Sequence, residues 1–435
     1  MKIKLQNIGI IEEADINVDG ITLIAGQNDS GKSTVGKVLY ALIRGVNIDE
    51  DRFNSSKSEF VRNKIKAVRN LLLRTKPTEA QDEEIQKRFI LSFLDRPDSL
   101  FGDFAYRIDF EDTKKIELLL SDIESIDDLY ADYSNKAFQI QLGTILNDIK
   151  NRISISSDSN EVLHYELESF FENEFGNQIK NKFKKGISYI EIEGKVEKKI
   201  NFEEPISFYG FETSSNFYYD EVFFIESPLK LENRNIIRFN SILRDKNSHL
   251  NNKIFEPKKE QDIFSDTSNN TEKLNSIISD VIKGDFQFNT KNQIVYKKQD
   301  VEFDLSNVAT GIKSFGVLQL LLKKDFLNSN TLLIIDEPEV HLHPIWQVKY
   351  AEILVLLSKE FAIPIVLTSH SPYFIEALEA YTKKHEYEKS TNFYFAEKNK
   401  DGLSSTIVDV TQDISPILSS ISDAFYTIQD INDEN

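Results

Sequence analysis

The segment 26–34 constrains the fold of this chain more than any other stretch. Its sequence, GQNDSGKST, has the form GxxxxGK[ST] and lies between an apolar segment at 21–25 and a periodic apolar segment at 35–42. A strand, a glycine-containing turn and a helix in this order make backbone N–H groups converge at the positive end of the helix, where an anion binds. The sequence therefore predicts a phosphate-binding loop after a buried strand.

The side chains of this loop suit a nucleoside triphosphate with its metal ion. Lys32 can reach the β and γ phosphates, and the Ser33 hydroxyl can complete the shell of a magnesium ion. The other positions predicted to bind the nucleotide are Gly26, Asn28, Ser30, Gly31 and Thr34.

A second motif follows about 300 residues later, at 331–338. The sequence TLLIIDEP is typical of a buried strand that ends in two carboxylates, Asp336 and Glu337. Neighbouring residues at a strand end point in opposite directions, so Asp336 can turn to the magnesium ion while Glu337 faces the attacking water. Such a pair alone is a weak signal, and it gains weight because a phosphate loop precedes it.

Three histidines near this motif are candidates for chemistry. His370 ends the apolar run at 363–369, and ligands bind at this end of strands in parallel α/β sheets. His341 and His343 suggest a metal site, but a loop that contacts another subunit is favoured because no cysteine accompanies them.

The strands before G-x-N-x-S-G-K-S-T and the string D-E-P-E-x-x-L-H-P resemble ABC-type ATPases of the RecF, SMC and OLD (overcoming lysogenization defect) group. The resemblance implies an α/β fold, a P-loop NTPase of ABC type with a mixed central sheet flanked by helices and a large, mainly helical insertion. It implies the cofactors ATP and Mg²⁺, with Ser33 and Asp336 as the ligands of the Mg²⁺. It also implies catalytic roles for Lys32, Glu337 and His370, with the histidine contacting the γ phosphate.

This chain differs from such ATPases in the signature motif. In the segment SNVATGIKS at 306–314, Thr310 and Gly311 match the motif in kind, whereas Ile312 and Lys313 replace its second glycine and its glutamine. A hydroxyl, a glycine N–H and a helix N-terminus can still bind a γ phosphate. The resemblance then implies ATP sandwiched between two protomers, and so a homodimer or a higher homo-oligomer.

The chain is predicted to consist of a first core segment at 1–45, an insertion at 46–300 and a second core segment at 301–435. In the insertion, Val61, Ile65, Val68 and Leu72 share one helical face, but prolines interrupt the pattern before a long coiled-coil arm can form. Segments 187–192 and 221–225 are predicted to return to the core sheet as strands. The polar segment 244–274 is predicted to be a mobile loop.

Composition excludes several classes of protein. A formal net charge of -19 argues against coating nucleic acid by bulk attraction, and the absence of cysteine excludes disulfides, thiolate zinc sites and cysteine nucleophiles. No apolar run approaches the ~20 residues that span a bilayer, so no membrane contact and a cytoplasmic location are expected. Two basic clusters are candidates for DNA contact, with solvated helix faces as the alternative: Lys57, Arg62, Lys64, Lys66, Arg69, Arg74 and Lys76; and Lys180, Lys182, Lys184 and Lys185.

The segment after His370 contains two predicted strands, at 392–396 and 405–408, so a Toprim nuclease like that of OLD proteins is not expected in it. The chain most resembles stand-alone OLD-like ATPases of bacterial anti-phage systems such as Septu and PARIS. That resemblance implies the sensor or regulator subunit of a separate effector protein, a nuclease or toxin. The alternatives are an ATP-dependent scaffold with negligible turnover that sequesters a partner, and a RecF-like DNA repair ATPase.

Overall fold

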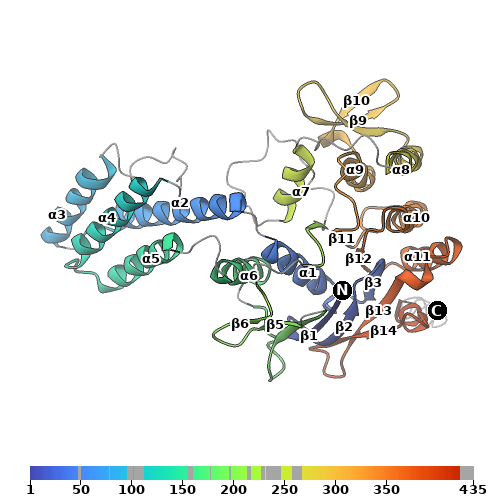
Figure 1. Cartoon of the computed structure of the whole chain (residues 1–435), viewed down its shortest axis with the longest axis horizontal. Coiled ribbons are helices and arrows are strands. Elements are labelled where there is room, and N and C mark those ends of the chain that lie inside the picture. Colours follow the sequence, from blue (N-terminus) through green and yellow to red (C-terminus); the bar gives the residue numbers. More distant parts are fainter. Residues whose placement is uncertain are drawn as a thin grey trace, which may run out of the picture. The chain divides into compact units, whose positions relative to one another are not determined.

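The computed structural model contains two compact units (Figure 1). The core unit consists of Met1–Asn47 and His164–Asn435, and the helical unit of Ile48–Leu163. The structure describes residues 1–47, 50–77, 79–95, 101, 112–154, 160–176, 178–194, 197–212, 217–226, 231, 246–256 and 267–421.

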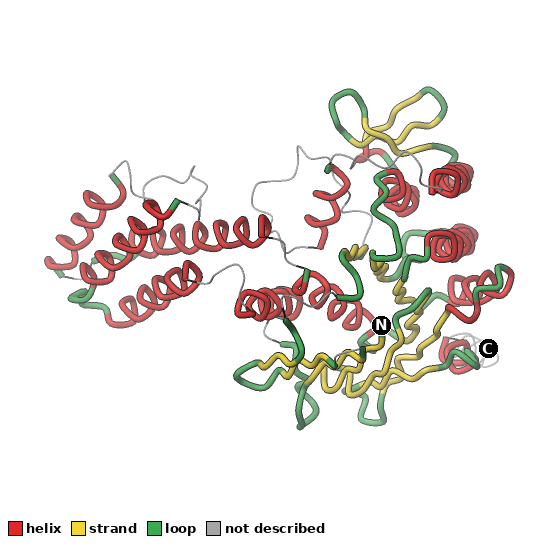
Figure 2. The backbone as a smooth tube through the Cα atoms, in the orientation of Figure 1, coloured by secondary structure: helices red, strands yellow, loops and turns green. Residues whose placement is uncertain are grey.

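A mixed sheet of eleven strands forms the centre of the described part of the core unit (Figure 2). Its strands, in spatial order, are β6 (Ser207–Tyr209), β5 (Lys198–Asn201), β4 (Tyr189–Glu193), β1 (Lys2–Ile8), β2 (Ile11–Asn17), β14 (Ser405–Asp409), β13 (Thr391–Lys398), β3 (Ile21–Gly26), β12 (Ile365–Ser369), β11 (Thr331–Asp336) and β7 (Glu221–Ile225).

The strands that lead to the two motifs are neighbours in this sheet. β13, β3, β12, β11 and β7 pair in parallel, and every residue of β3 and β12 is buried, as expected of a parallel sheet covered on both faces. β1 and β2 pair as an antiparallel hairpin, and the predicted strands β4, β7, β13 and β14 are confirmed.

Helices cover both faces of the parallel strands (Figure 1). Leu23, Leu333 and Leu367 pack into one core with α8 (Thr267–Ile282), α9 (Thr310–Lys323), α10 (Pro344–Phe361) and α11 (Pro372–Lys384). On the other face, Gly36 of α1 (Lys32–Val46) packs against Phe224 and Ile334. The predicted mixed sheet flanked by helices is therefore confirmed.

The remaining described elements of the core unit lie beside these layers. They are α6 (Asn160–Phe175) from His164 onward, α7 (Lys246–Phe255), the 3-10 helices η3 (Leu305–Asn307) and η4 (Glu388–Ser390), and a small antiparallel sheet of β8 (Asp285–Phe288), β9 (Ile294–Lys298) and β10 (Val301–Asp304).

The prediction of a loop at 244–274 was wrong for α7 and for the first part of α8. Polar residues dominate this segment, but Leu250 and Ile254 fall on one helical face, and Leu274 does so with Ile278. All four side chains are buried in the core unit, so tertiary packing outweighs the polar composition.

The helical unit has a core of its own. The described elements of this unit are α2 (Glu50–Arg74), α3 (Ala80–Phe89), the π-helix η1 (Ile90–Leu94), α4 (Thr113–Tyr130) and α5 (Lys136–Ser154). The predicted stripe Val61, Ile65, Val68 and Leu72 is buried in this core, which confirms the helical face of α2. Over the ranges that the structure describes, no helix is both long enough and apolar enough to cross a membrane.

Candidate nucleotide site

The loop between β3 and α1 has the geometry that its glycines predict. Gly31 has φ of 85°, in the left-handed region, and a Cβ built there would lie only 2.7 Å from Ile11 Cγ1. Only glycine fits this position without strain. Asn28 is exposed, whereas the Ser30 hydroxyl is buried and has no hydrogen-bond partner among the described residues. The loop therefore offers a cradle and an unused polar atom to a bound anion.

Lys32 begins α1 with its side chain buried. Its Nζ donates a 2.7 Å hydrogen bond to the carbonyl oxygen of Gln27. Burial lowers the pKa of Lys32, while the negative charges of Glu337, Asp336 and Glu339 oppose this shift. The amine consequently lies in the electrostatic field of the carboxylates that follow β11.

The Ser33 hydroxyl donates a 2.9 Å hydrogen bond to Asp336 Oδ1. Thr368 Oγ1 donates a short hydrogen bond to the same oxygen, because β11 and β12 pair with Asp336 opposite Thr368. Hydroxyl and carboxylate oxygens are the ligands that Mg²⁺ prefers, and this ion usually keeps few protein ligands beside substrate phosphates. Ser33 and Asp336 therefore fit a magnesium ion that a nucleotide brings with it.

Glu337 and His370 meet beside this pair. The backbone of Glu337 has φ of 50°, an uncommon conformation for a residue other than glycine, and its N–H donates to Thr368 Oγ1 at 3.1 Å. Its Oε1 lies 3.2 Å from His370 Nδ1. Asp336 and Glu337 thus contact different partners, Ser33 and His370 respectively.

Sequence reasoning missed Thr368 and Glu339. Glu339 is buried, and its Oε1 accepts 2.8 Å hydrogen bonds from the Ser369 hydroxyl and from the backbone N–H of His370. Burial raises the pKa of Glu339, although these hydrogen bonds and the charge of His370 oppose the shift. The second glutamate of the D-E-P-E string and the threonine before Ser-His were the available signals.

Thr310 and Gly311 form the first turn of α9, whose N-cap is Ala309. A Cβ at Gly311 would lie 3.0 Å from the carbonyl oxygen of His341, so glycine allows this turn to pack closely on the segment after β11. Within the described ranges, no hydrogen bond joins Thr310 or Gly311 to the loop at 26–34 of the same chain.

The two other candidate histidines have structural positions: His341 lies in a turn, and His343 caps a helix. His341 has φ of 70° in the turn before α10. His343 is the N-cap of α10 and accepts a 3.4 Å hydrogen bond from the N–H of Ile345, with Pro344 at the first helical position. In the parts of the chain that the structure describes, no group of three or more His, Cys, Asp or Glu side chains is placed to hold a metal ion.

The first basic cluster is not one uniformly exposed surface, and its contact with DNA stays a prediction. Lys57 is buried and donates a 2.8 Å hydrogen bond to the carbonyl oxygen of Ile153, and burial lowers its pKa to about 8. Lys64 pairs with Asp148 at 2.6 Å. Arg74 and Lys76 at the end of the cluster are exposed.

The second basic cluster is largely paired with acids or amides. Lys184 contacts Glu12 at 2.7 Å and Asp401 at 2.9 Å. Lys182 donates a 2.9 Å hydrogen bond to Gln178, and Lys180 lies 3.6 Å from Glu203.

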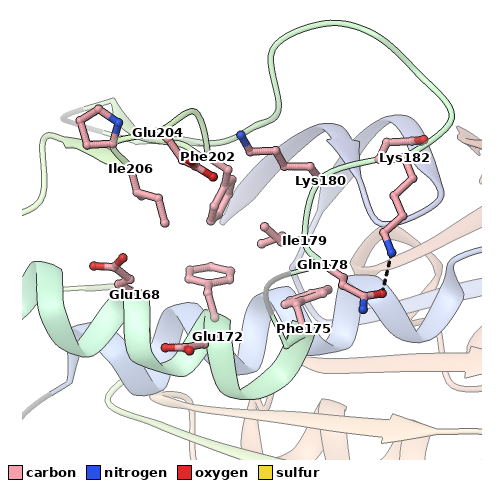
Figure 3. Close-up of a pocket in the computed structure, with 13 residues that line it drawn as sticks. Glu168, Glu172, Phe175, Gln178, Ile179, Lys180, Lys182, Phe202, Glu204 and Ile206 are labelled. Atoms are coloured by element: carbon pink, nitrogen blue, oxygen red, sulfur yellow. Dashed lines mark hydrogen bonds between the residues drawn. The ribbon is translucent and has the colours of Figure 1, made fainter. Parts of the chain in front are cut away.

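Lys180 and Lys182 also line a cavity of about 690 Å³ (Figure 3). The same cavity is lined by the carboxylates Glu168, Glu172 and Glu204, which would repel a phosphate backbone. No residue predicted to bind the nucleotide lines it.

Comparisons with solved structures give distant likenesses. The SMC head domain from Thermotoga maritima is 12% identical, with 94% of this chain and 98% of that chain covered and a TM-score of 0.38. An Smc head bound to the C-winged helix domain of ScpA is 9% identical, with 94% and 96% covered and a TM-score of 0.41. An Smc head domain with a coiled coil and joint from Pyrococcus yayanosii is 13% identical, with 97% and 99% covered and a TM-score of 0.37.

A search among curated proteins found no match to this sequence. The family model of the AAA ATPase domain, by contrast, matches residues 1–375, which include both motifs and the whole site described above. The chain therefore belongs to the AAA ATPase domain family and is a P-loop ATPase.

Proposed function

We propose that this chain binds ATP with Mg²⁺ in the site between α1 and the ends of β11 and β12, and hydrolyses the γ-phosphate bond. The observation that carries the proposal is the hydrogen bond from Ser33 to Asp336, because it brings the phosphate loop to the carboxylates of the second motif. The magnesium ion, when bound, supplies positive charge that offsets the charge developing on the phosphates.

The residues of the chain would bind the phosphates, position the attacking water and accept its proton. Lys32 would bind the β and γ phosphates, and the N–H groups of Gly26, Asn28, Ser30, Gly31 and Thr34 are the candidates for further phosphate contacts. Glu337, one-third exposed at its side chain, would accept the proton of the attacking water. His370 would contact the γ phosphate and hold that water.

We further propose that the active form is a homodimer or a higher homo-oligomer, in which Thr310 and Gly311 of a second copy complete the site. Three exposed apolar side chains support a contact surface beside the site: Val340 and Ile345 after β11, and Tyr373 after His370. The start of α9 supports it as well, because Thr310 is partly exposed and the N–H groups of Thr310 and Gly311 come before the first intrahelical hydrogen bond.

The experiment that tests hydrolysis is phosphate release by the purified full chain with ATP. We expect turnover with Mg²⁺, its loss when EDTA removes the metal, and its loss in Lys32→Ala. A Lys32→Ala chain that hydrolyses ATP as fast as the parent would contradict the assignment of the site.

Regulation of a separate nuclease or toxin in an anti-phage system is the finer role that the sequence resemblance implies, and it rests on that resemblance. Steady-state hydrolysis rates with and without DNA distinguish it from the alternatives. A rate that DNA raises supports an ATPase whose cycle drives or times an effector on nucleic acid, or a RecF-like repair ATPase. Stable ATP-bound oligomers with negligible turnover support a scaffold that sequesters a partner.

A further inference from the structure

Two carboxylates approach the same ring nitrogen of His370. Nδ1 lies 3.2 Å from Glu337 Oε1 and 3.4 Å from Glu339 Oε1. This nitrogen carries at most one hydrogen, so only one carboxylate can be its main acceptor. The choice matters, because a Glu337 that accepts the hydrogen of His370 is less able to take a proton from water.

The surroundings of the two carboxylates favour Glu339 as this acceptor. Its side chain is 5% exposed, against 33% for that of Glu337, so it loses no further solvent by accepting the hydrogen bond. Its Oε1 is already oriented by the Ser369 hydroxyl and the His370 N–H. A buried acceptor with a fixed orientation holds an imidazole better than a solvated one.

The network around Glu339 extends into α10. The Ser369 hydroxyl accepts the N–H of Ser371 at 3.1 Å, and the Ser371 hydroxyl donates to Gln347 at 2.6 Å. Glu339 Oε2 is buried without a hydrogen-bond partner in the described part of the chain, so its carboxylate has spare capacity as an acceptor. Glu339 therefore belongs to a rigid assembly, whereas Glu337 lies at its solvent side.

We propose that Glu339 is a positioning residue: it accepts the Nδ1–H of His370, fixes which ring nitrogen carries the proton, and leaves Glu337 to act as the base. Nε2, on the other side of the ring, is then left for the nucleotide or its attacking water. The catalytic consequence rests on the proposed function, whereas the hydrogen bond itself does not.

Nitrogen-15 NMR of the full chain labelled at histidine tests the hydrogen bond directly, because the shifts of the two ring nitrogens report which one is protonated. The chain has six histidines, and His370→Gln identifies the signals of His370. At about pH 8, we expect a proton on Nδ1 in the parent chain, although free imidazole favours Nε2. A parent His370 with a bare Nδ1 would overturn the proposal, whether or not any variant folds.

Two matched variants identify the acceptor. Glu339→Gln keeps an oxygen for the Ser369 hydroxyl and the His370 N–H but loses the charge, so the Nδ1-protonated fraction should fall. Glu337→Gln should leave that fraction unchanged. If the Nδ1-protonated fraction fell only in Glu337→Gln, or did not change in Glu339→Gln, Glu339 would not be the acceptor and the proposal would be wrong.

Kinetics then test the consequence. Glu339→Gln should lower kcat for ATP about 10- to 100-fold, as loss of a supporting hydrogen-bond partner does at other sites, while ATP affinity stays unchanged. An unchanged kcat beside an altered NMR signal would reject the catalytic role and keep the hydrogen bond. A parent chain without any hydrolysis would instead reject the proposed function, and the NMR result would still decide the hydrogen bond.

Discussion

The hydroxyl of Ser33 donates a 2.9 Å hydrogen bond to Asp336, which follows it by 303 positions in the chain. Ser33 lies in the first turn of α1, and Asp336 is the last residue of β11. The bond joins the phosphate loop near the N-terminus to a motif in the last third of the chain. The two halves of the site therefore come together only when the parallel strands of the core sheet have paired.

Replacing Lys32 by alanine should weaken ATP binding. The buried amine lies in the field of three carboxylates, and a bound phosphate would become its main anionic partner. Loss of a hydrogen bond to a charged group costs about 1.5–3 kcal/mol, so we expect roughly 10- to 100-fold weaker binding in calorimetric titration. Lys37→Ala, on the same helix, is the control and should bind as the parent does.

Replacing Glu337 by glutamine should separate binding from hydrolysis. The amide cannot take a proton from water, so kcat should fall by about 100- to 10,000-fold while ATP affinity is retained. An ATP-bound dimer should accumulate, which size-exclusion chromatography with light scattering can measure. Glu302→Gln, exposed on β10, is the matched control. Hydrolysis at the parent rate in Glu337→Gln would show that another group is the base.

Replacing Thr368 by valine should raise the magnesium concentration that half-saturates hydrolysis. The hydroxyl of Thr368 donates to Asp336 and accepts the N–H of Glu337, so its loss frees the carboxylate that is to hold the metal. Loss of such a supporting partner costs about 10- to 100-fold in metal affinity. Magnesium titrations of phosphate release measure the effect, with Thr406→Val on β14 as the control. Identical midpoints would mean that Thr368 does not orient Asp336.

The sequence predicted the parts of the site that are local in the chain. Gly31, Lys32 and Ser33 belong to one short motif, and the apolar runs before Asp336 and His370 are long enough to identify buried strands. These features need no knowledge of tertiary structure, because each is set by backbone geometry and by burial of one strand.

The unpredicted residues depend on contacts between distant segments. Thr368 meets Asp336 only through the register of β11 with β12, and the burial of Glu339 depends on the end of β12 packing on the turn after β11. Lys57 was assigned to a charged surface because its sequence neighbours are basic, yet it points into the helical unit. Composition cannot distinguish a buried cation from a solvated one at the edge of an amphipathic helix.

Lys57 should make the free energy of unfolding depend on pH. Burial lowers its pKa from 10.5 to about 8, so between these values the unfolded chain binds more protons than the folded chain. The free energy of unfolding should therefore rise with pH in this window, by about 1–3 kcal/mol from this residue.

Lys57→Met isolates this contribution. The difference in unfolding free energy between variant and parent, measured by urea denaturation at several pH values, should favour the variant most at low pH and shrink as pH rises. Lys76→Met, exposed beyond the end of α2, is the control for loss of a charge. A pH-independent difference for Lys57→Met would contradict a buried, destabilised cation.

A mixing experiment tests whether Gly311 acts on the nucleotide of a second copy. Its missing Cβ would lie 3.0 Å from the His341 carbonyl oxygen, so Gly311→Val should displace the first turn of α9 and abolish hydrolysis while ATP still binds at Lys32. Lys32→Ala should also be inactive, because it lacks the amine that binds the phosphates. A mixed dimer then holds one intact site, built from Lys32 of one subunit and Gly311 of its partner. Random mixing makes half of the dimers mixed, so about one quarter of the parent rate should return. If Gly311 served its own subunit, each variant would lack an intact site in every dimer, and mixing would restore nothing.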